Sequence, residues 1–273
     1  MKEIAKLIPL DAQSDSHRSQ TDKSKAPSPL RSAGALQSSV SRRKFLSTAV
    51  AAPAVLGILR NVKAAGEVIS FKSPNSKLQF VLVTTGAQLQ YRITRADRSI
   101  VELSRLAFLL NGIDLCRDST ISKIERYRIS EKYSTRGIHS AAVNNCVGAR
   151  IWITHPPSKT DYVMEVRAFN DGVGFRWVIS GSGSRVPDEA TFFKFPTGCT
   201  VWFHDFEGHY EGVHQKKTIE DVSHGEWVAP PLTIRLPGGK GYAAVSEAAL
   251  IGYPGMGLRA DGQRGFTTVL GHA

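Results

Sequence analysis

The chain has 273 residues and is 41% hydrophobic, so it can bury a core, and global disorder is excluded. Its formal net charge is +11, a value that would suit a nucleic-acid-binding protein. The excess charge lies near the N-terminus, however: residues 1–65 hold 11 of the 35 Lys and Arg and 4 of the 24 Asp and Glu. Residues 66–273 therefore carry only about +4 and contain no basic run interleaved with aromatics, so nucleic-acid binding is not predicted.

Residues 1–65 are predicted to be an export leader. Residues 1–40 are rich in Ser, Lys, Gln and Asp without apolar periodicity, which predicts disorder. An apolar stretch over residues 45–59 follows Arg42 and Arg43 and precedes a small-residue cleavage site ending at Ala64. As a short helix it reaches only about 22 Å, less than the ~30 Å hydrocarbon core, so it is not predicted to span a membrane.

The paired arginines resemble a twin-arginine signal, because Phe45 and Leu46 follow the second arginine at two and three places. The leader therefore predicts a periplasmic or secreted protein that crosses the membrane folded. The alternative is a buried apolar helix behind a basic tail.

Three cysteines, Cys116, Cys146 and Cys199, are too few and too scattered for a disulfide scaffold. We predict three buried or half-buried thiols, although one pair could form a disulfide in an oxidising compartment.

From Gly66 onward the apolar residues recur with a period of two, which predicts strands. The clearest runs cover residues 78–83, 89–93, 162–168 and 232–236. Asn170-Asp171-Gly172 is predicted to join strands over 163–168 and 174–179 in a hairpin with positive φ. No segment has the pattern of a capped amphipathic helix. The sequence therefore predicts an all-β fold, a large antiparallel β-sandwich forming one domain over residues 66–273.

Residues 202–211, Trp-Phe-His-Asp-Phe-Glu-Gly-His-Tyr-Glu, form the densest cluster of polar and aromatic side chains. Aromatic faces stack on sugar rings, and carboxylates accept from hydroxyls or bind calcium, so this pattern suits carbohydrate handling. The alternative is a loop at the rim whose aromatics pack on the edge of the sandwich.

Three further patterns, in the histidines, two glutamates and two tryptophans, are not predicted to form functional sites. His204, His209 and His214 are spaced by five, which does not favour a zinc site on a strand or a helix. Glu207 and Glu211 lie in one loop and make a weak glycosidase acid pair, since such pairs usually come from different elements. Two tryptophans inside apolar runs are predicted to be core residues: Trp152 and Trp177.

Four segments resemble the N-terminal domain of glycoside hydrolase family 97, the α-glucosidase and α-galactosidase family. They occur in the expected order and spacing, and the resemblance extends over about residues 70–260. The segments are Ser-Pro-Asn-Ser-Lys-Leu (73–78), Ser-Arg-Leu-Ala-Phe (104–108), Phe-Asn-Asp-Gly-Val-Gly-Phe-Arg (169–176), and Ser-Glu-Ala-Ala-Leu with Tyr-Pro-Gly-Met (246–256).

This resemblance implies a β-supersandwich that precedes a catalytic (β/α)₈ barrel. In the family the barrel carries the catalytic carboxylates and most ligands of a calcium ion, and the N-terminal domain contributes one glutamate. The matching position here, nine residues after Trp202, is Glu211. The resemblance thus implies a Ca²⁺ ligand at Glu211, an α-glucoside or α-galactoside as the substrate of the whole enzyme, and no catalytic residue in this chain.

The chain departs from the family pattern in two places. Residues 143–146, Val-Asn-Asn-Cys, stand where the family tends to have a Tyr-Asn-Glu-Leu-like run, and only Asn144 matches. The chain is also expected to stop before the closing strands of the sandwich, which would leave residues 265–270 as an unpaired edge.

Two other functions are carried as alternatives. A free-standing periplasmic carbohydrate-binding module would need an exposed aromatic platform from among Trp202, Phe206, Tyr210 and Trp227. A sugar epimerase on a sandwich fold would need a convergent pair from among His139, His155 and Glu247.

Overall fold

A computed structural model of the chain describes seven stretches, and of the predicted leader they include only residues 3–4. The described residues are 3–4, 68–84, 86–136, 139–181, 185–207, 212–248 and 253–271. Arg42, Arg43, Ala64, Glu211 and the predicted helix over residues 45–59 lie outside the described residues, as does the predicted disordered segment apart from residues 3–4. Disorder is wrong for those two residues, which form the short strand β1 (Glu3–Ile4). Contacts divide the chain into one unit made of Met1–Ala12 and Arg60–Ala273 and a second unit, Gln13–Leu59. All elements below belong to the first unit.

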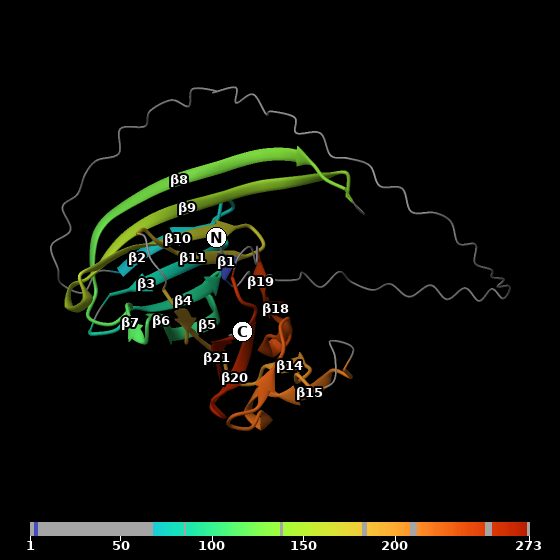
Figure 1. The fold of residues 1–273 in the computed structure, drawn as a ribbon. Helices are drawn as coiled ribbons and strands as arrows, with labels where there is room; N and C mark the ends of the chain where they lie inside the picture. Colours follow the sequence, from blue (N-terminus) through green and yellow to red (C-terminus); the bar gives the residue numbers. More distant parts are fainter. Residues whose placement is uncertain are drawn as a thin grey trace, which may run out of the picture. The chain divides into compact units, whose positions relative to one another are not determined.

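The largest sheet is antiparallel throughout and has the strand order β19-β1-β11-β10-β9-β8 (Figure 1). Its long strands β8 and β9 pair over nearly their whole length, whereas β10 accompanies β9 only as far as Cys146. The outer part of the β8–β9 hairpin therefore extends beyond β10 as a two-stranded ribbon. The strands are β19 (Glu247–Ala248), β1 (Glu3–Ile4), β11 (Val173–Ile179), β10 (Thr160–Phe169), β9 (Ala141–His155) and β8 (Thr120–Ser134).

Four smaller antiparallel sheets make up the rest of the described domain. The first has the order β2-β3-β4-β5, and the others are β12-β6-β7, β13-β21-β20-β16 and β15-β14-β17-β18. Their strands are β2 (Val68–Lys72), β3 (Leu78–Val83), β4 (Gln90–Arg95), β5 (Arg98–Arg105), β6 (Phe108–Leu110), β7 (Ile113–Asp114), β12 (Pro187–Glu189), β13 (Phe192–Lys194), β14 (Thr200–Phe203), β15 (Gln215–Thr218), β16 (Trp227–Val228), β17 (Leu232–Arg235), β18 (Tyr242–Val245), β20 (Met256–Ala260) and β21 (Gly265–Leu270).

The helical elements among the described residues are three short 3₁₀ turns, η1 (Pro156–Ser158), η2 (Ile219–Asp221) and η3 (Pro237–Gly239). Within the described stretches, no helix has the length and apolar character that crossing a membrane requires. The predicted all-β, antiparallel fold is confirmed.

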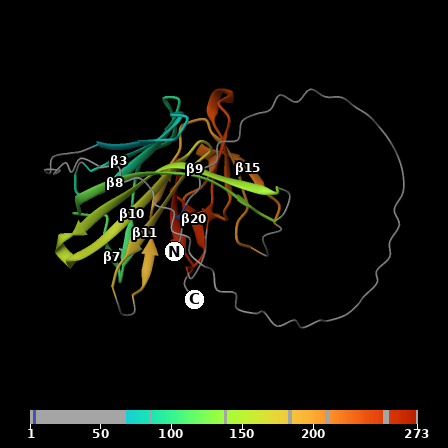
Figure 2. The same ribbon diagram turned by 90° about the horizontal axis from the view of Figure 1, so that it is seen from above.

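The core lies where the large sheet packs on the β2–β5 sheet. Phe80 of β3 contacts Phe175 of β11 with ring centroids 6.3 Å apart, and Tyr91 of β4 lies 5.7 Å from Phe175. Tyr91 also meets Phe193 of β13 edge-on at 6.1 Å, so a third sheet joins the same core. Figure 2 shows β9, β10 and β11 running side by side over this core. Each of these rings is fully buried and contributes about 2–3 kcal/mol through the hydrophobic effect.

The cysteine prediction is confirmed, since Cys116, Cys146 and Cys199 are all buried and none forms a disulfide. Burial raises the pKa of the Cys199 thiol to about 12 and that of the Cys116 thiol well above its ordinary value. Both thiols are therefore held in their unreactive, protonated form at neutral pH.

The predicted hairpin at residues 170–172 is present, because Phe169 N–H donates to the Gly172 carbonyl at 2.8 Å and Ala168 faces Val173. The expected positive φ is wrong, since Asn170, Asp171 and Gly172 keep negative φ. The chain uses positive φ instead at the β4–β5 turn, where Ala96 and Asp97 have φ of 46° and 63°.

The prediction of an unpaired edge over residues 265–270 is also wrong. Strand β21 pairs with β20 on one side, with Leu258 opposite Thr268, and with β13 on the other, with Phe193 opposite Phe266. Strand β13 comes from some 70 residues earlier in the chain, and only the tertiary fold brings it to cover this edge.

Candidate functional site

The polar and aromatic cluster at residues 202–211 begins on β14 and is described as far as Glu207. Trp202 is half-buried beneath its neighbours: the ring of Tyr242 lies 6.2 Å away, and the cations of Lys216 and Arg235 lie 5.8 and 5.9 Å from the Trp202 ring centroid. Trp202 therefore does not form an open platform. Tyr210 and Glu211 lie outside the described residues.

Phe206 and Trp227, by contrast, are exposed and lie next to each other. Their side chains are 47% and 40% exposed, and their rings meet edge-on with centroids 6.0 Å apart and planes at 84°. Both rings pass close over Gly257 of β20, where an added Cβ would come within 3.0 Å of Phe206 and 3.4 Å of Trp227. The absence of a side chain at Gly257 therefore allows the two rings to settle against the sheet.

The two rings border an apolar hollow of about 430 Å³, formed with the ends of β20 and β21. Its lining consists of Phe206, Trp227, Met256, Val269, Leu270 and the glycines Gly255, Gly257 and Gly271. None of these side chains carries a hydrogen-bonding group apart from the Trp227 indole. We call this surface the Phe206–Trp227 hollow.

The chemistry of the Phe206–Trp227 hollow suits a protein surface better than a sugar. A sugar site needs several convergent polar groups for the hydroxyls in addition to an aromatic face. An exposed apolar patch with aromatic residues at its centre is typical of a protein interface.

The five-residue spacing of the histidines did not favour a shared site, but the structure brings two of them into contact. His204 and His214 lie in contact, with ring centroids 5.1 Å apart, because β14 and β15 form a hairpin that places Phe203 opposite Gln215. His209 is outside the described residues. Across the described stretches, no group of three His, Cys, Asp or Glu side chains is arranged to hold a metal ion.

The residues considered for an epimerase pair have separate structural partners. His155 is buried at the end of β9 and its Nδ1 lies 2.6 Å from Ser158 Oγ, where it caps η1. The Glu247 carboxylate accepts from the Met256 N–H at 2.8 Å. His139 is exposed. These contacts give no support to a convergent His/Glu pair.

Both strand tryptophans were predicted to be core residues; the prediction is confirmed for Trp177 and wrong for Trp152. Trp177 packs against the core and stacks on Phe108 at 5.4 Å with an interplanar angle of 15°. Trp152 lies on the opposite face of the large sheet, half-buried, with Lys123 Nζ 4.4 Å from its ring centroid. Its neighbours Ile151 and Ile153 point into the core instead.

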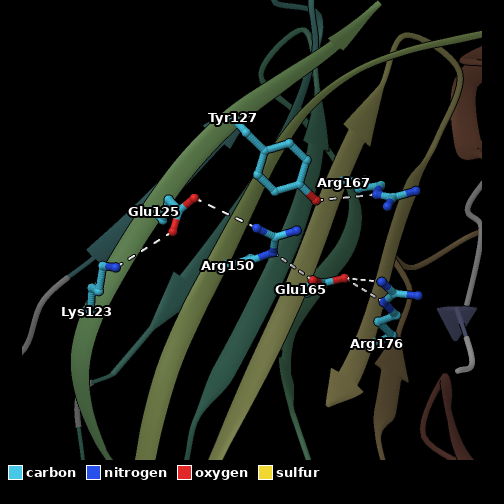
Figure 3. Close-up of polar contacts among 7 residues, drawn as sticks. All are labelled: Lys123, Glu125, Tyr127, Arg150, Glu165, Arg167 and Arg176. Atoms are coloured by element: carbon cyan, nitrogen blue, oxygen red, sulfur yellow. Dashed lines mark hydrogen bonds and ion pairs between the residues drawn. The ribbon is translucent and has the colours of Figure 1, made fainter. Parts of the chain in front are cut away.

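The face of the large sheet that carries Trp152 holds a row of alternating charges. Four strands contribute one residue each, in register: Glu125 of β8, Arg150 of β9, Glu165 of β10 and Arg176 of β11. Figure 3 shows Glu165 between the two arginines; Arg150 Nε donates to one carboxylate oxygen at 2.9 Å and Arg176 Nε to the other at 2.6 Å. Glu125 continues the row to Arg150 at 3.8 Å and to Lys123 at 3.7 Å.

The electrostatics of this row make Glu165 a structural residue. Burial alone would raise the pKa of the Glu165 carboxyl, but hydrogen bonds from Arg150 and Arg176 outweigh it, and the pKa is lowered. The same contact raises the pKa of Arg150. A carboxylate held ionised in this way is a poor general acid or base, because catalysis needs a pKa near the working pH. The sequence pattern did not predict this row of charges, because the row depends on the register in which the four strands pair.

The next row of the same face depends on a glycine. Tyr127 of β8 stands opposite Gly148 of β9, and its ring lies over the Gly148 Cα, where a Cβ would overlap the ring. This placement lets the Tyr127 hydroxyl reach across β9 and accept from Arg167 Nε of β10 at 3.4 Å (Figure 3).

The fold and the hollow together define an all-β sandwich domain with an apolar surface suited to another protein domain. Residues 71–271 match the family model described as Glycosyl-hydrolase 97 N-terminal. The chain therefore belongs to the family of N-terminal domains of glycoside hydrolase family 97.

Named relatives agree with this assignment. The chain is 28% identical to a probable retaining α-galactosidase from Streptomyces bingchenggensis over 163 residues, which is 58% of this chain and 25% of the relative. It is 23% identical over 211 residues to the retaining α-galactosidase of Bacteroides thetaiotaomicron, covering 72% of this chain and 31% of that protein. The chain thus spans between a quarter and a third of the length of these relatives.

Solved structures share the fold. A glycoside hydrolase family 97 enzyme from Pseudoalteromonas sp. strain K8, in complex with panose, superposes with a TM-score of 0.68 at 21% identity, covering 74% of this chain and 32% of that one. A β-arabinopyranosidase superposes with a TM-score of 0.65 at 18% identity, covering 75% of this chain and 36% of that one.

Proposed function

We propose that this chain is the non-catalytic N-terminal module of an exported α-glycosidase and that it docks on a catalytic domain through the Phe206–Trp227 hollow. The observation that carries the proposal is the hollow itself, which combines two exposed aromatic rings with an apolar floor. Family membership supports a catalytic domain as the occupant, because the relatives are glycoside hydrolases three to four times longer than the matched region. The substrate class proposed for the assembled enzyme is an α-galactoside or α-glucoside.

The proposal includes a shared calcium site. Glu211 is preceded in the sequence by two further carboxylates, Asp205 and Glu207. Asp205 accepts from the Glu207 N–H at 3.0 Å, which keeps these two residues in a tight turn. Calcium requires six to eight oxygen ligands, so this loop would supply a minority of them and a docked domain the rest. The donor set fits a shared site in which Glu211 is the ligand from this chain.

A free-standing carbohydrate-binding module is the second candidate, and the exposure of Phe206 and Trp227 is the observation in its favour. Two features oppose it. The ring planes stand at 84° to each other and cannot form one flat platform, and the hollow has almost no polar group to receive sugar hydroxyls. The geometry therefore supports docking better.

The experiment measures association between this chain and a separately expressed family 97 catalytic domain, for example that of the B. thetaiotaomicron enzyme, by sedimentation velocity. The double variant Phe206→Ala/Trp227→Ala should weaken association at least about tenfold, since buried aromatic anchors dominate interface energies. The matched control is Val143→Ala, a 69% exposed apolar residue on the β8–β9 hairpin, which should bind like the wild type. Equal association of the double variant and the control would refute docking through this hollow.

A further inference from the structure

A second hollow, of about 550 Å³, lies where turns from two sheets meet, and it differs chemically from the Phe206–Trp227 hollow. The β4–β5 turn and the start of β3 form one side, and the β17–β18 turn forms the other. A hollow of this size is within the range of small-ligand sites. We call it the cationic hollow, because four of its lining residues are basic and only one is acidic: Lys77, Arg95, Arg98 and Lys240, against Asp97.

The backbone holds these cations together. Leu78 of β3 pairs with Arg95 of β4, and Arg95 pairs across the β4–β5 hairpin with Arg98, so Lys77, Arg95 and Arg98 meet at one end of the sheet. Ala96 N–H donates to the Lys77 carbonyl at 2.8 Å and ties the turn to β3. The direct cross-strand pairing of Arg95 with Arg98 places two like charges side by side, which raises the positive potential at this end of the sheet.

Three of the cations have no partner for their charge. The side chains of Lys77, Arg98 and Lys240 form no hydrogen bond or ion pair with any residue in the described stretches. Other exposed cations of the domain do have a partner; Arg117, for example, lies 3.6 Å from Asp118. With one acidic residue against four basic ones, the rim of the cationic hollow is a net positive patch.

The floor of the hollow is apolar. Ile100 and Leu236 are buried beneath it, and Pro196, Pro237 and the ring of Tyr242 are half-buried in its wall. Proline and tyrosine rings offer flat apolar faces of the kind on which the C–H face of a pyranose packs. A flat apolar wall under a cationic rim matches a ring that carries a negative group.

We propose that the cationic hollow is a binding site for an acidic oligosaccharide, in which a pyranose ring packs against Tyr242 and its carboxylate or sulfate group meets Arg98, Lys77 and Lys240. The site involves different strands from the Phe206–Trp227 hollow, and its existence does not depend on docking of a catalytic domain. Carboxylate and sulfate share the chemistry that the rim recognises, and separate probes distinguish them.

The test is equilibrium binding of the full chain, by calorimetry, to a short oligogalacturonate, a short sulfated oligosaccharide and a neutral maltooligosaccharide of the same length. At least one acidic probe should bind, more tightly than the neutral one, and binding should weaken with added salt because the rim charges are exposed. The double variant Arg98→Gln/Lys240→Gln should lose at least about fivefold in affinity, the effect expected of two exposed charge contacts. Both side chains are exposed, so the variant should fold.

The matched control is Lys72→Gln/Lys132→Gln, which removes the same charge from exposed positions on β2 and β8 outside the hollow and should bind like the wild type. Tyr242→Leu should weaken binding of the acidic oligosaccharide and leave competition by inorganic sulfate unchanged. Equal affinity of the two double variants, or binding of neither acidic probe, would overturn the proposal. A further probe is a single-stranded oligonucleotide of equal charge. The sugar assignment would be overturned if the oligonucleotide bound as tightly as the acidic sugars and Tyr242→Leu had no effect on binding.

Discussion

The ring of Tyr127 occupies the space in which Gly148, its cross-strand partner, would carry a side chain. Replacing Gly148 with Ala should push the ring away and break its contact with Arg167. We expect a loss of about 1–3 kcal/mol in the free energy of unfolding, as for overpacking in general. Urea unfolding of the variant and the wild type measures this difference in free energy. The double variant Tyr127→Ala/Gly148→Ala should cost less than the sum of the two single changes; strict additivity would contradict the packing argument.

Glu165 should make the stability of the domain depend on pH. Its folded pKa is lowered, so its contribution is present above the unfolded value of about 4.3 and is lost as the pH falls through the folded pKa. Glu165→Gln should cost about 1–3 kcal/mol at pH 7, because Arg176 is left largely buried with a weaker partner. The urea midpoints of the variant and the wild type should differ at pH 7 and converge at pH 3. The exposed control Asp118→Asn should change little, and an equal effect of both variants would count against the network.

The leader should direct export through the twin-arginine route. Residues 1–65, fused to a reporter that must fold before it crosses the membrane, should place the reporter in the periplasm. Arg42→Lys together with Arg43→Lys should abolish export, because the route reads the arginine pair. Cell fractionation measures the outcome, with the single change Lys44→Gln as a control that keeps the pair. Normal export of the paired variant would show that another route is used.

The purified chain should not hydrolyse aryl α-galactosides or aryl α-glucosides above background. Glycoside hydrolysis needs two carboxyl groups placed across a cleft, and Glu165, a buried carboxylate on the large sheet, is held by hydrogen bonds from two arginines. Release of nitrophenol measures the activity. Turnover that persists through purification and disappears in one carboxylate variant of this chain would contradict the non-catalytic assignment.

Calcium binding should be weak in the isolated chain and tighter with a catalytic domain present. With one to three carboxylates from residues 205–211, we expect a dissociation constant of roughly millimolar or weaker. A matching catalytic domain should tighten the site and make it depend on Glu211, which Glu211→Gln tests while it keeps the shape of the side chain. Calorimetry that finds micromolar binding by the isolated chain, unchanged in Glu211→Gln, would rule out the shared site.

The alternation of apolar and polar residues was sufficient to predict the strands and much of the core. Leu78, Phe80 and Leu82 are all fully buried on one face of β3, and the turn at Asn170-Asp171-Gly172 joins β10 to β11 as predicted. Period-two patterns and turn residues act over a few neighbouring positions, so one sequence is enough to read them.

Which strand lies beside which, and which face of a strand meets the core, was decided by the tertiary structure. The run Ile151-Trp152-Ile153 is apolar at every position, so the pattern did not reveal that Trp152 faces away from the core. Phe206 and Trp227 are separated by 21 residues, and they meet because each packs over Gly257 of a third segment. Lys77, Arg98 and Lys240 converge for the same reason, since turns that are distant in the chain end at one place. Such sites depend on long-range strand pairing, which a local pattern in the sequence does not specify.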